Sequence, residues 1–170
     1  MFGMLTFLRC HKWPIATFIA IITIGYGARS ATGSVYSAAE AITLLEALSR
    51  AGLYLASAIA GGSTTIMALM LTLIGMFRRM DHDFDNQAYR DVDLIARLAT
   101  SSLLGSLLLL MAFTFPVGEF DDLPRKWFET LYEALFVGTV LVIALAGATV
   151  VLIYTTLRRV ISHITPGDAV

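Results

Sequence analysis

Residues 134–157 read ALFVGTVLVIALAGATVVLIYTTL, a stretch without a single Asp, Glu, Lys, Arg or His side chain. A helix needs about 20 predominantly apolar residues to cross the hydrocarbon core of a bilayer. Only a helix or a closed barrel satisfies its own backbone hydrogen bonds there. This stretch is long enough for such a helix, and it therefore predicts a transmembrane segment.

Three more runs of the same kind precede it, at residues 13–28, 51–77 and 98–117. Hydrophobic residues make up 57% of the chain, above the roughly 45–50% that is typical of soluble domains, and the mean hydropathy is +0.75. We therefore expect an all-α, polytopic membrane protein with four transmembrane helices in a single membrane domain, residues 1–170. The first run also has features of a signal peptide, and we interpret it as the first span.

The distribution of Lys and Arg predicts how the chain crosses the membrane, because short cytoplasmic loops are enriched in these residues. Eight of the twelve flank the spans on one side of the membrane, and the others flank them on the opposite side. The larger group is Arg9, Lys12, Arg78, Arg79, Arg90, Arg97, Arg158 and Arg159. This bias predicts that both termini are cytoplasmic, and we expect the membrane to be the bacterial inner membrane.

The connection between the first two spans carries a helical pattern over residues 37–50, on the predicted extracytoplasmic side. Ser37 and Glu40 fit a capping box, and apolar residues then recur at helical spacing on one face. Glu46 and Arg50 lie on the opposite face as an i,i+4 pair. We expect an amphipathic helix that lies in the membrane interface or continues directly into the second span. Glu40 and Glu46 are pore-mouth candidates.

The second and third spans carry small residues spaced four apart, a pattern that lets helix backbones approach closely in lipid. The predicted helix-packing residues are Ala58, Gly61, Gly62, Gly105 and Ser106. The same spans carry neighbouring hydroxyl groups, which could line a hydrated path without a fixed charge. The pore-lining candidates are Ser63, Thr64, Thr65, Thr100, Ser101 and Ser102. Ordinary helix packing is the alternative interpretation of these hydroxyl-bearing residues.

Nothing in the sequence indicates an enzyme or a cofactor. His11, His82 and His163 all flank the spans, which argues against haem ligation inside the bundle. The G-x-S-x-G and H-E-x-x-H signatures are missing, and no Asp or Glu lies in the middle of a span, where proton pumps and ion-coupled transporters need one. Cys10 is the only cysteine, and a net charge of -1 gives no reason to expect nucleic acid.

Two acidic clusters lie between spans. The candidate metal ligands are Asp81, Asp83 and Asp85. Their alternation resembles the start of a calcium-binding loop, although Asn86 stands where that loop needs glycine and Val92 where it needs glutamate. A solvated turn is the alternative. On the opposite side of the membrane, the pore-mouth candidates are Glu119, Asp121 and Asp122, which would concentrate cations.

These observations favour a non-enzymatic integral membrane protein, and we expect a homo-oligomeric channel or pore for small ions, with cations favoured. The first alternative is an accessory or structural subunit packed against a larger membrane complex. The second alternative is a membrane scaffold or sensor that engages a partner through the Asp-rich cytoplasmic loop. The expected partners are the lipid bilayer and either further copies of this chain or a larger membrane complex, and the sensor would also need a cytoplasmic partner.

Overall fold

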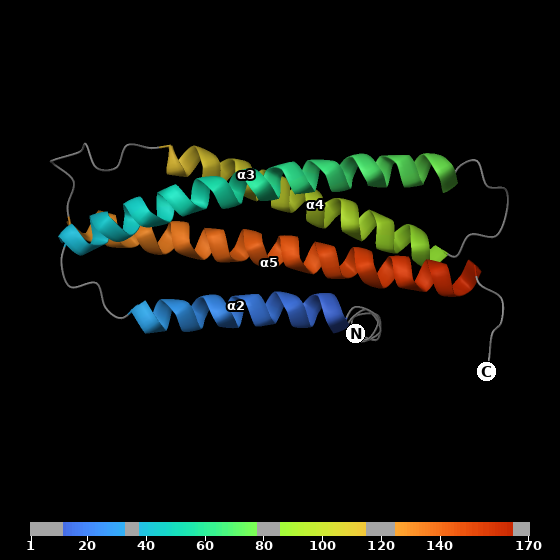
Figure 1. Cartoon of the computed structure of the whole chain (residues 1–170), viewed down its shortest axis with the longest axis horizontal. Coiled ribbons are helices and arrows are strands. Elements are labelled where there is room, and N and C mark those ends of the chain that lie inside the picture. Colours follow the sequence, from blue (N-terminus) through green and yellow to red (C-terminus); the bar gives the residue numbers. More distant parts are fainter. Residues whose placement is uncertain (1–11, 33–37, 78–85, 115–124, 165–170) are drawn as a thin grey trace.

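The computed structural model describes residues 12–32, 38–77, 86–114 and 125–164, which are helical apart from a turn at Thr114. The helices are α2 (Lys12–Thr32), α3 (Ala38–Phe77), α4 (Asn86–Phe113) and α5 (Arg125–Ile164). They form an elongated bundle in which α3 and α5 run in one direction and α2 and α4 run in the other (Figure 1).

Each of these helices contains a stretch long and apolar enough to cross a membrane. The stretches are Lys12–Ala31, Thr43–Gly75, Arg90–Phe113 and Thr130–Arg158. The prediction of an all-α chain with four such helices is confirmed, which supports an integral membrane protein. Both α3 and α5 have 40 residues, or about 60 Å at the usual helical rise. They are therefore longer than a bilayer of about 40–45 Å.

The predicted amphipathic helix, residues 37–50, is helical from Ala38 and forms the first part of α3 without a break. Leu45 is buried, and Leu44 and Leu48 pack against the same apolar cluster. Glu46 is exposed, as the pattern predicts. The apolar face of this segment therefore packs against protein. The side of the membrane on which the segment lies stays a prediction.

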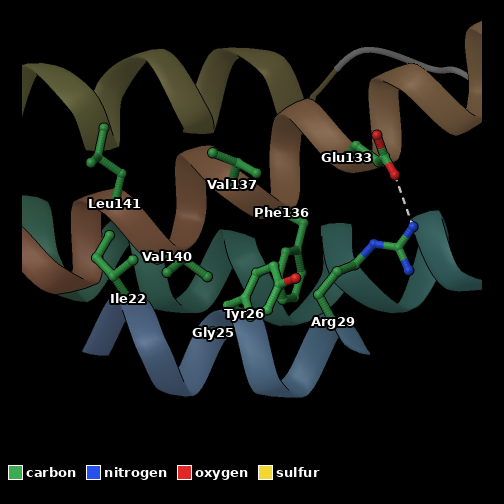
Figure 2. A pocket seen from close by; sticks show the side chains of 9 residues that line it. All are labelled: Ile22, Gly25, Tyr26, Arg29, Glu133, Phe136, Val137, Val140 and Leu141. Carbon is green, nitrogen blue, oxygen red and sulfur yellow. Dashed lines mark hydrogen bonds and ion pairs between the residues drawn. The ribbon is translucent and has the colours of Figure 1, made fainter. Parts of the chain in front are cut away.

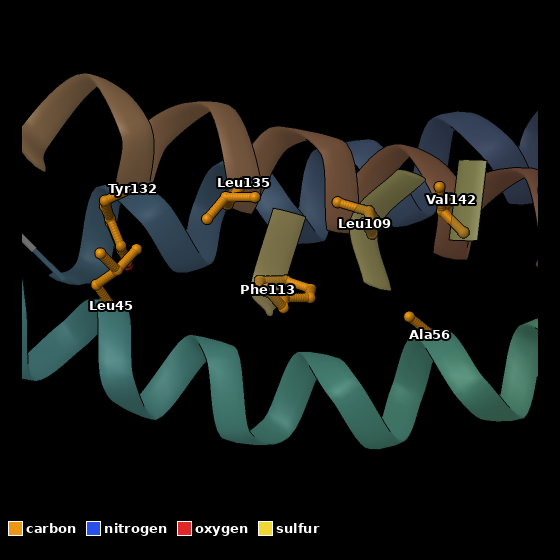
Figure 3. Packing of buried hydrophobic residues seen from close by; sticks show 7 residues of the cluster. All are labelled: Leu45, Ala56, Leu109, Phe113, Tyr132, Leu135 and Val142. Atoms are coloured by element: carbon orange, nitrogen blue, oxygen red, sulfur yellow. The ribbon is translucent and has the colours of Figure 1, made fainter. Parts of the chain in front are cut away.

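The core lies between α3, α4 and α5, which all contact one another, and α2 packs along α5 (Figure 1). One apolar cluster occupies the half of the bundle near the start of α3, and Figure 3 shows its side chains converging from the three helices. Its buried members are Leu45, Ala56, Leu109, Phe113, Tyr132, Leu135 and Val142. A second cluster is formed by Met70, Val92, Ile95 and Leu152.

Glycines bring the helices close together at two of these contacts. A Cβ atom on Gly52 of α3 would lie 2.5 Å from the Phe113 ring of α4. A Cβ atom on Gly25 of α2 would lie 2.5 Å from Cγ1 of Val140 on α5. Because lipid is as apolar as the helices, such close packing is a main source of association between them.

Candidate functional site

The pore-lining candidates divide between the inside and the outside of the bundle. Ser63 and Ser102 are buried, with 4% and 1% of their surface exposed. Thr100 is half-buried, and its hydroxyl oxygen lies 3.8 Å from the sulfur of Met67. The exposed candidates are Thr64, Thr65 and Ser101. Because successive helical residues are about 100° apart, the neighbours Ser101 and Ser102 face different surroundings.

The hydroxyl groups of the exposed candidates donate hydrogen bonds within their own helices. Thr64, Thr65 and Ser101 each donate to the backbone carbonyl four residues earlier, over 2.9, 3.0 and 2.9 Å respectively. Such bonds satisfy the hydroxyl donor without an outside partner. These side chains can therefore face lipid or another helix at little energetic cost.

Buried hydroxyl groups also lie in the core between the three packed helices. Ser106 and Thr149 have 0% and 1% of their surface exposed, and both donate to carbonyls of their own helices, over 2.8 and 2.7 Å. Ser102 differs, because its Oγ is buried and has no hydrogen-bond partner.

Replacing Ser102 with alanine should stabilise the protein. The change removes a buried, unsatisfied hydroxyl group, whose burial costs about 1–3 kcal/mol, and adds no atoms to the core. At about 2–4 °C for each kcal/mol, we expect the melting temperature in mild detergent to rise by about 2–12 °C. Ser106→Ala is the matched control, since it removes a hydroxyl that is bonded, and should leave the melting temperature unchanged or slightly lower. A fall for Ser102→Ala would mean that its hydroxyl has a stabilising partner.

The predicted helix-packing residues also fall into two groups. Gly105 and Ser106 pack inside the chain: Ser106 is fully buried, and a Cβ atom on Gly105 would lie 2.8 Å from Cγ2 of Val142. The others lie on the outside of α3. Gly61 and Gly62 are exposed, and a Cβ atom on either would meet no atom within 4 Å.

We call Ala58, Gly61, Gly62 and Thr65 the small-residue face of α3. All four are exposed, and their spacing places them on one side of the helix. The large exposed side chains Tyr54 and Leu69, 79% and 57% exposed, continue this side of the helix in either direction. The helix therefore presents a stretch of about 11 Å at which another backbone could approach closely.

Most of the acidic candidates lie outside the residues that the structure describes. Those outside the described residues are Asp81, Asp83, Asp85, Glu119, Asp121 and Asp122. Glu40 lies in the first turn of α3, its side chain outside the described part, and Glu46 is exposed. Within the described ranges, no three His, Cys, Asp or Glu residues are grouped so that they could hold a metal ion.

An ion pair between two helices and a buried aspartate were not predicted from the sequence. Arg29 of α2 donates from Nη2 to Oε1 of Glu133 on α5 over 2.8 Å, across a sequence separation of 104 residues. The only sequence signal is that both residues lie at span ends on the same predicted side. On α4, Asp91 is only 2% exposed, whereas Asp93 is exposed and pairs with Arg97 over 2.8 Å.

Comparison with protein-family models, with curated proteins and with solved structures finds no match.

Proposed function

We propose that this chain is a non-enzymatic accessory subunit of a membrane assembly, and that it docks onto another transmembrane helix through the small-residue face of α3. The observation that supports this most strongly is the open space at Gly61 and Gly62. At the intrachain contacts of Gly25, Gly52 and Gly105, by contrast, a neighbouring side chain fills that space.

The chemistry of this face suits a helix better than lipid. Small residues spaced four apart let two backbones come into van der Waals contact, which gives dispersion energy that mobile lipid tails supply less well. Thr65 adds a hydroxyl group that already donates to the Gly61 carbonyl over 3.0 Å, so contact with a partner helix leaves no donor unsatisfied. We place this assembly in the bacterial inner membrane, with both termini cytoplasmic.

A homo-oligomeric cation channel is the second candidate. It is favoured by the exposure of Thr64 and Thr65 on α3, since copies arranged with these positions inward would present rings of hydroxyl groups. Close backbone contact at Gly61 and Gly62, however, would narrow a lumen there. The third class, a scaffold or sensor that uses the Asp81–Asp93 loop, depends mainly on residues outside the described ranges.

Native mass spectrometry of the protein extracted in mild detergent from its own host tests the proposal. We expect a fixed stoichiometry with larger membrane proteins. Gly62→Leu should weaken this association about 5- to 150-fold, the factor that corresponds to about 1–3 kcal/mol of steric overlap. The melting temperature of the isolated chain should not fall, because Gly62 has open space around it.

Gly27→Leu is the matched control. Gly27 is also exposed, and a Cβ atom there would meet nothing within 4 Å, but it lies on α2. This variant should associate as the wild type does. A monomeric wild-type protein, or equal association of both variants, would contradict the proposal. A closed ring of identical chains with measurable conductance would favour the channel instead.

A further inference from the structure

A groove with a volume of about 330 Å³ runs along the contact between α2 and α5. Its floor and walls are apolar, with Gly25, Val140 and Phe136 among them (Figure 2). Tyr26 and Val137 line it as well and are 77% and 63% exposed, so the groove opens on the outside of the bundle. Its volume lies within the range of small-molecule binding sites, about 300–1,000 Å³.

One end of the groove is charged. The Arg29 guanidinium and the Glu133 carboxylate, which also line it, form the ion pair of 2.8 Å across the two helices (Figure 2). Their side chains are 26% and 53% exposed, so both groups can be reached from outside. The guanidinium carbon also lies 6.0 Å from the ring centroid of Tyr132, close enough for a cation–π contact that fixes its position.

The groove reaches about two thirds of the way through one leaflet of the hydrocarbon core. Arg29 lies near the end of the span Lys12–Ala31, and Glu133 lies near the start of the span Thr130–Arg158. The charged end therefore falls at the level of the lipid headgroups. From Arg29 to Ile22 the groove follows α2 for about 10 Å, into the apolar core, where one leaflet is about 15 Å thick.

We propose that this groove binds a phospholipid with a zwitterionic headgroup that carries a primary ammonium, as in phosphatidylethanolamine. The phosphate lies against Arg29, the ammonium donates to Glu133, and one acyl chain occupies the apolar groove. Both headgroup charges then meet an opposite charge, and both contacts are charge-assisted hydrogen bonds. By the predicted orientation, the lipid belongs to the extracytoplasmic leaflet.

The charges at the groove separate this lipid from the other common classes. An anionic headgroup such as phosphatidylglycerol brings its phosphate to Arg29 but has no cation for Glu133, which repels it. The quaternary ammonium of phosphatidylcholine has no N–H group and therefore cannot donate a hydrogen bond to the carboxylate. The geometry thus predicts a preference for the primary ammonium.

Lipid titration followed by native mass spectrometry tests this proposal. The full-length protein in mild detergent is titrated separately with phosphatidylethanolamine, phosphatidylcholine and phosphatidylglycerol that carry identical acyl chains. The first phosphatidylethanolamine should bind about tenfold more tightly than either of the others, the factor expected for one charge-assisted hydrogen bond. Equal affinities, or tightest binding of phosphatidylglycerol, would overturn the proposal.

Variants locate the site. Glu133→Gln should reduce the affinity for phosphatidylethanolamine about tenfold, to that of phosphatidylcholine. Arg97→Ala is the matched control, because it removes an exposed, ion-paired arginine on α4 and should change nothing. Val137→Trp should fill the groove with the ion pair intact and displace the first bound lipid of each class, while the melting temperature shows that the protein stays folded. Unchanged binding in either groove variant would contradict the assignment.

Discussion

Gly52→Leu should disrupt the packing of α3 against α4. Even a Cβ atom at this position would lie 2.5 Å from Cε2 and Cζ of Phe113, and Phe113 is itself held in the apolar cluster, with 6% of its surface exposed (Figure 3). Overpacking of a core costs about 1–3 kcal/mol. We therefore expect the melting temperature in mild detergent to fall by about 2–12 °C, at about 2–4 °C for each kcal/mol.

Gly61→Leu provides the comparison on the same helix. It adds the same side chain where a Cβ atom would meet nothing within 4 Å, so the melting temperature of the isolated chain should stay within about 2 °C of the wild type. Adding Phe113→Ala to Gly52→Leu should recover part of the loss, because the new side chain then has the volume of the ring to occupy. Equal melting temperatures of Gly52→Leu and Gly61→Leu would contradict the close contact between Gly52 of α3 and Phe113 of α4.

Gly25→Leu should separate α2 from the rest of the bundle. A Cβ atom on Gly25 would lie 2.5 and 2.8 Å from the two methyl carbons of Val140, and Val is stiff at χ1 and cannot easily turn away. Since α2 packs against α5, whereas α3, α4 and α5 also contact one another, we expect α2 to detach while the other three helices stay together.

Disulfide formation measures this separation. In a Cys10→Ser background, cysteines at positions 21 and 147 should form a disulfide, because a Cβ atom added to Gly147 would lie 2.6 Å from Cδ1 of Ile21. Adding Gly25→Leu should reduce the yield at least tenfold, whereas the control Gly27→Leu should leave it unchanged. An undiminished yield with Gly25→Leu would show that α2 and α5 tolerate the added side chain.

The sequence predicted the helices well because a span needs only length and apolar composition. For residues 37–50, the sequence allowed either a separate helix in the membrane interface or a direct continuation into the second span. The structure shows the continuation, from Ala38 onward. The side of each helix that faces the protein interior could not be predicted. A helix in lipid is apolar on every side, so it lacks the polar stripe that marks the outer side of a helix in a soluble protein. Gly61 and Gly105 have the same small-residue context in the sequence, yet the first is exposed and the second packs against Val142.

The residues of the candidate site could not be sorted into buried and exposed ones for the same reason. Ser101 and Ser102 are identical in type and adjacent, and only the packing of α4 makes one exposed and the other buried. The pair of Arg29 and Glu133 depends on the alignment of α2 with α5, 104 residues apart. A single sequence contains no signal for such a long-range contact beyond the shared position at span ends.

Photo-crosslinking in native membranes tests the proposed docking most directly. A photoreactive side chain in place of Tyr54, 79% exposed, would lie beside the small-residue face of α3, and one in place of Tyr154, 62% exposed on α5, serves as the control. We predict a discrete protein adduct from position 54 that Gly62→Leu abolishes, and none from position 154. No protein adduct from position 54, or the same adducts from both positions, would contradict docking through this face.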